Sequence, residues 1–303
     1  MDTTQRITVL DGGMGRELLR IGAPFRQPEW SALALMEGPE WVVRAHANFI
    51  EAGAEVITTN TYAIVPFHLG ADRFTERGRE LASLSGRLAR QAADESPTGE
   101  TSVRVAGSLP PLFGSYRPDL FDPDAAPHVI DPLVDGLAPH ADLWLGETLS
   151  SIVEAIAVRG AIDRAGVGER PLWISYTLDD GRTGTLRSGE PVRDAVSAAL
   201  DLGAAAVLFN CCQAETITVA IEAAYAQVGS GGALVGGYAN RFVDSHAEDG
   251  EANEQLATFR DDLDPSSYAE FVSRWVDAGA AIVGGCCGMQ PEHIARIAEL
   301  VHR

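Results

Sequence analysis

The four cysteines of this 303-residue chain stand in two adjacent pairs, and each pair follows an apolar run. The first run ends in Asn210-Cys211-Cys212, and the second ends in Gly284-Gly285-Cys286-Cys287-Gly288. Thiolates are preferred ligands of zinc, and a catalytic zinc keeps three protein ligands and one open position. The two pairs therefore predict a zinc site to which both runs contribute.

The choice among the four thiols depends on backbone geometry. Neighbouring residues on a regular strand point to opposite faces, so Cys286 and Cys287 converge only where the strand breaks, and the flanking glycines permit such a break. Cys211 lies nearest the end of its strand, whereas Cys212 already enters the next helix and is expected to pack. We therefore predict Cys211, Cys286 and Cys287 as the metal ligands. Two alternatives are buried cysteines that only pack and a structural zinc held by all four thiols.

Polar residues also follow other strand-like runs. Asp11 follows Ile7-Thr-Val-Leu10 and begins the glycine turn Asp11-Gly-Gly-Met-Gly15. Asn60, Ser108 and Glu147 stand in equivalent places after three further runs. If the strands are parallel and form a barrel, these residues and the thiols meet at one mouth. Thr58 and Thr59 fit either strand packing or ligand contact, because β-branched residues favour strands.

Strand-like runs alternate with helical segments along the chain. The expected strands are residues 7–10, 55–59, 103–107, 143–146, 172–176, the run around Val207, 233–237 and the run around Ile282. The expected helices are residues 41–52, 73–93, 152–165, 191–202, 214–226, 268–278 and 291–301. Three helices lead into a strand through an acidic residue, any residue and Gly-Ala, beginning at Glu51, Asp201 and Asp277.

Eight such strand–helix units favour a single (β/α)8 TIM barrel, with the active site at the C-terminal ends of the strands. A doubly wound open sheet is the structural alternative. We expect one barrel domain over residues 1–303.

Charge and composition limit the partners. The chain has 23 basic and 43 acidic residues, a formal net charge of -20, which repels nucleic acid and anionic membranes. We expect no nucleic-acid or membrane partner, and small molecules as substrates. The first residues lack the features of a signal peptide, so we expect a cytoplasmic location, where cysteines are free, metal-bound or catalytic.

Several motifs together resemble the homocysteine S-methyltransferases, in order and over nearly the whole chain. They are Asp11-Gly-Gly-Met-Gly15, Glu51-Ala-Gly-Ala-Glu-Val-Ile-Thr-Thr-Asn-Thr-Tyr62, Glu147, Asn210-Cys211, and Gly284-Gly-Cys-Cys-Gly288 followed by Pro291-Glu-His-Ile294. The double-glycine, double-cysteine motif is the specific one, since a glycine turn after a strand is common.

The resemblance implies a (β/α)8 barrel whose zinc is held by Cys211, Cys286 and Cys287, with the homocysteine sulfur as fourth ligand. It also implies that Asp11, Gly12, Gly13 and Glu147 hold the amino acid end of homocysteine. Thr59 and Asn60, within the second motif, are expected to contact substrate as well. A carboxylate at Glu147 suits an ammonium group, and backbone N–H groups in a glycine turn suit a carboxylate.

Three departures from the family pattern lie in the expected mouth loops. Arg16 stands where family members commonly have Thr. Gly107-Ser-Leu-Pro-Pro111 replaces a Gly-Ser-x-Gly-Pro stretch, and Tyr238-Ala-Asn-Arg-Phe242 replaces a Tyr-Pro-Asn-like run. These positions bear on the choice of donor and acceptor and leave the expected zinc ligands unchanged.

The residues and the resemblance together predict zinc-dependent methyl transfer from a sulfonium donor to homocysteine, forming methionine. S-methylmethionine is the preferred donor and S-adenosylmethionine the second candidate. Betaine as donor and selenocysteine or another thiol as acceptor are alternatives. A metal-dependent hydrolase or lyase with Glu147 as base, and a non-catalytic zinc-binding or thiol-binding protein, are the rival functions.

Overall fold

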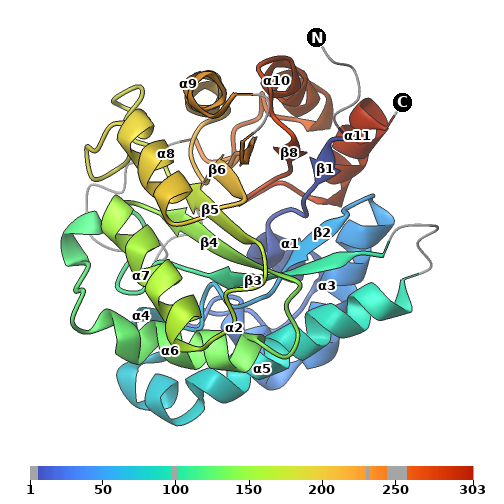
Figure 1. Ribbon diagram of the computed structural model, residues 1–303. Helices are drawn as coiled ribbons and strands as arrows, with labels where there is room; N and C mark the ends of the chain where they lie inside the picture. The colour runs from blue at the N-terminus through green and yellow to red at the C-terminus, as the bar shows by residue number, and fades with distance from the viewer. Residues whose placement is uncertain (1–5, 97–101, 230–231, 244–257, 303) are drawn as a thin grey trace.

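Eight parallel strands form the centre of the molecule in the computed structural model, which describes residues 6–96, 102–229, 232–243 and 258–302 (Figure 1). The strands are β1 (Thr8–Val9), β2 (Val56–Thr58), β3 (Arg104–Leu109), β4 (Leu143–Leu149), β5 (Leu172–Tyr176), β6 (Ala206–Asn210), β7 (Leu234–Tyr238) and β8 (Ile282–Val283). Each predicted strand run overlaps one of them, and β3, β4 and β7 extend beyond the predicted ends. The (β/α)8 barrel predicted from the sequence is therefore confirmed.

The sheet closes on itself. Sequential strands pair from β2 to β8, and β8 pairs with β1 through Thr8 beside Ile282. A parallel bridge between Leu10 and Val56 joins β1 to β2, and the N–H of Asp11 donates to the carbonyl of Val56 at 3.1 Å. Closure places the C-terminal ends of all eight strands around one opening.

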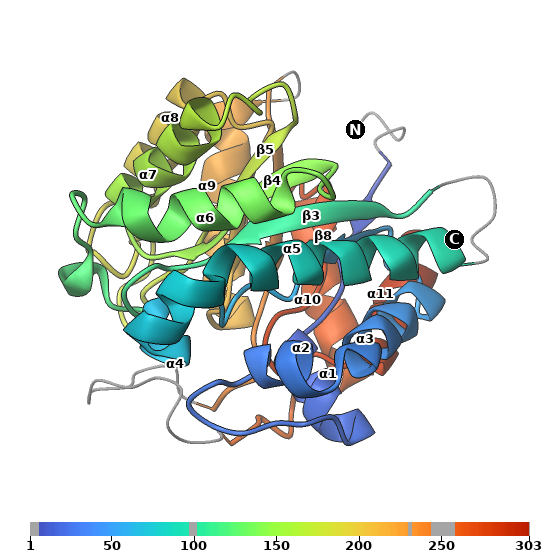
Figure 2. The ribbon, with the colours of Figure 1, turned by 90° about the horizontal axis from the view of Figure 1, so that it is seen from below.

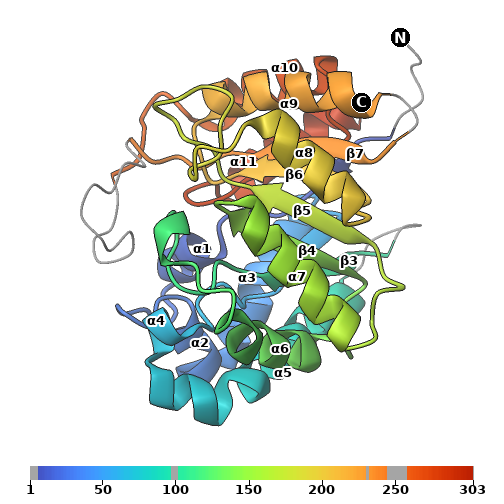
Figure 3. The same cartoon turned by 60° about the vertical axis from the view of Figure 1, so that its left-hand side comes forward.

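Helices surround the strands and follow the predicted alternation. They are α3 (Pro39–Glu51), α5 (Ala71–Glu95), α6 (Ala126–Leu137), α7 (Ile152–Arg164), α8 (Val192–Asp201), α9 (Ala214–Val228), α10 (Pro265–Asp277) and α11 (Pro291–Val301). Figure 2 shows α5 and α6 side by side along β3, and in Figure 3 the strands lie between α9 and α10 on one side and α5 and α6 on the other. No helix in the described ranges is long and apolar enough to cross a membrane.

The predicted helix list lacked α6 and the shorter α1 (Met14–Ile21), α2 (Ala32–Glu37) and α4 (Pro66–Leu69). Helix α6 carries Pro132 inside it, and an internal proline argues against a helix because it removes a backbone hydrogen bond. Burial of its apolar face, including Ile130, Leu133 and Leu137, outweighs that cost. Helices α1, α2 and α4 are too short to show a clear period.

The three Gly-Ala turns have the conformation that the sequence predicted. Gly53, Gly203 and Gly279 have φ values of 101°, 76° and 105°, in the left-handed region that a side chain disfavours. Each glycine ends a helix and lets the chain reverse into β2, β6 or β8. The short turns deliver these strands into the barrel at regular intervals.

The barrel interior is filled by side chains. Its apolar cluster consists of Leu10, Val56, Ala106, Leu143, Leu145, Trp173, Ala206, Leu208, Tyr238 and Ile282. Cys286 packs on this cluster, and the hydroxyl of Tyr238 reaches Glu147. The packed interior therefore forms the floor of the site at the mouth.

Candidate metal centre and substrate pocket

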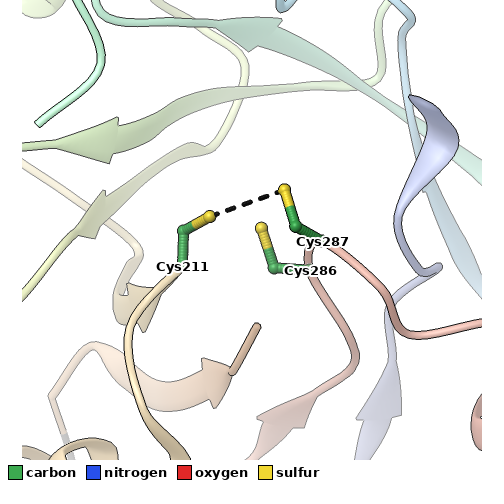
Figure 4. A group of neighbouring side chains, drawn as sticks. All are labelled: Cys211, Cys286 and Cys287. Atoms are coloured by element: carbon green, nitrogen blue, oxygen red, sulfur yellow. Dashed lines mark hydrogen bonds between the residues drawn. The ribbon is translucent and has the colours of Figure 1, made fainter. Parts of the chain in front are cut away.

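Three of the four thiols meet at the C-terminal ends of β6 and β8. The Sγ atoms of Cys211, Cys286 and Cys287 all lie within 4.8 Å of one another, and those of Cys211 and Cys287 are 3.7 Å apart (Figure 4). Among the described residues this is the one group of three or more such ligand atoms that can hold a metal ion. Cys212 is outside this group and fully buried, as expected for a packing residue.

The backbone around each thiol explains how they converge. Strand β8 ends at Val283, and the following turn places Cys286 and Cys287 on the same side, with the N–H of Cys286 donating to the carbonyl of Ala239 at 2.9 Å. Gly288 completes this turn with a φ of 84°. Cys211 itself has a φ of 55°, which is rare for a residue with a side chain and directs its thiol away from the helix that follows.

The thiols share protons unequally. Hydrogen bonds from Cys286 and Cys287 hold the pKa of Cys211 well below its ordinary value. The bond to Cys211 raises the pKa of both Cys286 and Cys287. Of the three thiols Cys211 is therefore the one that loses its proton most readily, and a metal cation binding here would displace the thiol protons.

Two carboxyl groups lie in the same pocket, Asp11 buried and Glu147 half-buried. Asp11 is 3% exposed and accepts a hydrogen bond from the N–H of Thr58 at 2.7 Å, and burial raises its pKa well above the ordinary value. Glu147 accepts hydrogen bonds from the hydroxyls of Ser108 at 2.8 Å and Tyr238 at 3.3 Å. Burial raises the pKa of Glu147 to about 7. A cationic ligand group between them would stabilise both ionised forms.

All nine predicted site residues line one pocket of about 930 Å³, counting its open mouth. Three of the predicted substrate-binding residues also form hydrogen bonds that fix the wall of the pocket. The N–H of Gly13 donates to the carbonyl of Met289 at 2.9 Å, the hydroxyl of Thr59 accepts from the N–H of Ser108 at 3.0 Å, and the amide of Asn60 donates to the carbonyl of Ser31 at 3.1 Å.

The first glycine turn packs directly against the second cysteine pair. A Cβ atom added to Gly13 would lie 2.7 Å from the carbonyl oxygen of Cys286 and 3.0 Å from the nitrogen of Gly288. A contact at 2.7 Å is closer than side chains tolerate. Glycine at this position therefore lets α1 reach the turn that carries the thiols.

Aromatic residues that were not predicted as site residues also line the pocket. The hydroxyl of Tyr116 lies 2.9 Å from Sγ of Cys211, and the guanidinium carbon of Arg187 lies 4.4 Å from the centre of the Tyr116 ring. Tyr62, Trp30 and Phe242 complete the aromatic wall. Tyr116 lies between β3 and α6, and only the folded chain shows that it reaches a thiol.

Fold and site together define a class: (β/α)8 barrel proteins with three clustered thiols that can hold a metal and two carboxyl groups at the mouth. A family model described as homocysteine S-methyltransferase matches residues 8–301. The chain belongs to the homocysteine S-methyltransferase family, which confirms the resemblance seen in its motifs. It is therefore an enzyme of a methyltransferase family.

Several named proteins are similar to this chain over most of their length. Homocysteine S-methyltransferase of Escherichia coli (strain K12) is 29% identical, over 97% of this chain and 94% of its own. Selenocysteine Se-methyltransferase of Brassica oleracea var. italica is 27% identical, over 95% of this chain and 87% of its own. The metallated form of the homocysteine methyltransferase MmuM from Escherichia coli superposes with a TM-score of 0.79 at 27% identity, covering 98% of this chain and 96% of that one.

Proposed function

We propose that this enzyme uses zinc to transfer a methyl group from a sulfonium donor to homocysteine, forming methionine. S-methylmethionine is the preferred donor, and S-adenosylmethionine is the second candidate. The observation that carries the proposal is that three thiols and two carboxyl groups meet in one pocket. The thiols suit a soft metal, and the carboxyl groups suit the ammonium end of an amino acid.

The donor set fits zinc. Three thiolates leave one of four tetrahedral positions open for a substrate. Cys211, Cys286 and Cys287 would hold the ion, and their present proton-sharing contacts show that they can approach one another closely. When bound, zinc lowers the pKa of a coordinated thiol, so that homocysteine reacts as a thiolate at neutral pH. A metallated relative of the same fold supports a metal here.

The chain's own residues orient the acceptor. Asp11 and Glu147 bind the ammonium group, and Thr58, Ser108 and Tyr238 hold these carboxylates in place by the hydrogen bonds described above. The turn at Gly12 and Gly13 lies beside the carboxylate of the amino acid, with Thr59 and Asn60 forming the adjoining wall. This binding fixes the sulfur of homocysteine next to the three thiols.

The transfer itself requires alignment more than acid–base chemistry. The acceptor sulfur forms a bond to the donor's methyl carbon while the bond from that carbon to the donor sulfur breaks. The electron pair returns to the donor sulfur, which becomes a neutral thioether, and the thiol proton of homocysteine is released to solvent. Holding both sulfurs in line with the methyl group supplies most of the acceleration.

Other acceptors and donors fall within the same chemistry. One relative is named a selenocysteine Se-methyltransferase, and a selenol would bind and react at the same position as a thiol. Betaine is the alternative donor, because it also presents a methyl group on a positively charged atom. The aromatic wall of Tyr62, Tyr116 and Phe242 can face either cation.

Metal analysis and a substrate panel test the proposal. Protein purified without added zinc is analysed for metal, and methionine formation from homocysteine is measured with S-methylmethionine, S-adenosylmethionine and betaine. Selenocysteine replaces homocysteine in a parallel series. We expect about one zinc per chain and the fastest turnover with S-methylmethionine. Zinc without turnover of any donor would refute methyl transfer, and absence of metal even after refolding with zinc would refute the metal site.

A further inference from the structure

Arg16 is the one cationic side chain among the described residues that line the substrate pocket. The other charged residues there are Asp11 and Glu147, and the three clustered thiols add further negative charge when a metal binds. The whole chain is acidic, with a formal net charge of -20. A positive group on this wall bears on the charge of what the pocket binds.

The position of Arg16 is fixed by its surroundings. It is the third residue of α1, and the start of α1 packs on the turn at Cys286 and Gly288. Its guanidinium carbon lies 4.5 Å from the centre of the Phe259 ring, a cation–π contact. Phe259 in turn covers Gly288, where an added Cβ would lie 2.8 Å from the ring.

A second aromatic ring, that of Phe242, packs on Phe259. The rings of Phe259 and Phe242 stack with centres 6.1 Å apart, and Phe242 lines the pocket. Burial lowers the pKa of Arg16, and the negative charge of Cys287 opposes this effect. The guanidinium is thus held beside the metal ligands. Asp11 is buried, whereas Arg16 is partly exposed at the opening.

This arrangement is unfavourable for a donor that carries only positive charge. A sulfonium entering the pocket is repelled by a guanidinium on the same wall unless the donor also carries an anionic group. The acceptor's ammonium group goes to Asp11 and Glu147. Asp11 is buried whereas Arg16 is partly exposed, so the acceptor reaches deeper into the pocket than Arg16. The donor approaches from the mouth, where Arg16 lies.

We propose that Arg16 binds the carboxylate of the methyl donor and restricts this enzyme to zwitterionic donors, whose positive methyl-bearing group and carboxylate are in one molecule. The inference rests on the proposed methyl transfer and adds the class of donor. A planar guanidinium pairs with a carboxylate through two parallel hydrogen bonds. This pair holds the far end of the donor and turns its methyl group toward the thiols.

The first test measures donor binding without turnover. Zinc-loaded protein is titrated calorimetrically, in the absence of homocysteine, with S-methylmethionine and with its carboxamide, which lacks the carboxylate. We expect Arg16→Gln to weaken binding of S-methylmethionine about tenfold or more and to leave binding of the carboxamide unchanged. Arg16→Lys keeps the charge but loses the paired geometry, so its loss should be smaller.

Arg241→Gln is the matched control. Arg241 flanks the same ring, with its guanidinium carbon 5.6 Å from the centre of Phe259, but it does not line the pocket. We expect this variant to bind S-methylmethionine as the unmodified enzyme does. Zinc content equal to that of the unmodified enzyme shows that each variant retains the folded metal centre.

Steady-state kinetics separate the two substrates. We expect Arg16→Gln to raise KM for the donor and to leave KM for homocysteine unchanged. A rise in KM for homocysteine alone would show that Arg16 binds the acceptor's carboxylate and would overturn the inference. So would unchanged S-methylmethionine binding in Arg16→Gln, or no binding by the unmodified enzyme. Failure of the proposed function looks different, because the unmodified enzyme would then form no methionine with any donor.

Discussion

Several residues in the pocket have pKa values that are shifted from their ordinary values. The pKa of Cys211 is lowered by its contacts with Cys286 and Cys287, while desolvation raises the pKa values of Asp11 and Glu147. A divalent metal satisfies the thiols, and an ammonium group satisfies the carboxylates. The thiols and the carboxyl groups are thus suited to the proposed ligands.

The thiols are predicted to be unequal in function. Cys286→Ala or Cys287→Ala should abolish both metal binding and methyl transfer, because two thiolates leave the tetrahedral site incomplete. Cys212→Ala should spare both, since Cys212 is buried outside the cluster. Metal content of the purified variants, measured by atomic emission, checks this. Loss of zinc in Cys212→Ala would contradict the assignment of ligands.

Glu147 should make the stability of the ligand-free enzyme depend on pH. Its pKa is raised to about 7 from the ordinary 4.5. The stability contributed by the protonated form is fully present below 4.5 and is lost as pH rises through 7, because the folded state then loses the proton that it held more tightly than the unfolded chain. Glu147→Gln should therefore raise Tm relative to the unmodified enzyme at pH 8.

Thermal unfolding at pH 8 and at pH 5 measures this effect, and the gain in Tm should shrink at the lower pH. The same variant should lose homocysteine binding, because a neutral amide cannot pair with an ammonium group. A gain in Tm that is equal at both pH values would argue against a raised pKa. In the unmodified enzyme, homocysteine binding should strengthen as pH rises through about 7, as Glu147 ionises.

At the scale of elements, the end of β4 determines where Glu147 points. The register of β4 against β5 shifts between Gly146 and Leu149, and Thr148 has a φ of 59°. Such an irregularity re-aims a side chain next to a site. Asn210, at the end of β6, holds the end of β4 in place. Its side chain accepts a hydrogen bond from the N–H of Thr148 at 3.1 Å and donates one to the Thr148 hydroxyl at 2.8 Å.

Asn210 therefore links the carboxylate site to the metal site. Asn210→Ala should lower the free energy of unfolding by about 1–3 kcal/mol, because buried groups on Thr148 and Ser175 lose their partner. It should also raise KM for homocysteine by releasing the end of β4. Urea unfolding and steady-state kinetics measure the two effects. A stable variant with unchanged KM would show that the irregular end of β4 holds its shape without Asn210.

At the scale of the whole molecule, the site exists only because the barrel closes. The cysteines that follow β6 and β8 lie 75 or 76 positions apart in the sequence, and closure brings them together with Asp11, which follows β1. Strand β7 lies between β6 and β8 and pairs with both. Close packing at β7 is therefore required for the metal site.

Gly236 on β7 tests this requirement. A Cβ atom there would lie 2.0 Å from the carbonyl oxygen of Ile282, so Gly236→Ala must push β7 and β8 apart. We expect a loss of about 3 kcal/mol in the free energy of unfolding, with weaker metal binding. Gly160→Ala on α7 is the control. Its Cβ meets only the flexible end of Arg164, and alanine favours the helix by up to about 1 kcal/mol. Equal stability of both variants would contradict the strand-packing argument.

Local sequence patterns predict much of this architecture. The run of apolar residues before each cysteine pair, and the Gly-Ala turns at Gly53, Gly203 and Gly279, predict strands that helices feed through tight turns. Such features depend on residues close in sequence, so a pattern can show them. Helix α6 was missed because Pro132 is locally unfavourable, and only burial against β3 and its neighbouring helices stabilises the helix.

The barrel, the family and the residue types of the site could be predicted from sequence patterns: three thiols, two carboxyl groups and a glycine turn. Tertiary structure decided what those groups contact. Tyr116 reaches Cys211, Arg16 stacks on Phe259 and Asn210 holds Thr148, although each pair is far apart along the chain. Sequence spacing encodes the direction of a side chain on its own strand or helix. The distance between two such side chains depends on closure of the whole barrel, and that distance sets the chemistry of the site.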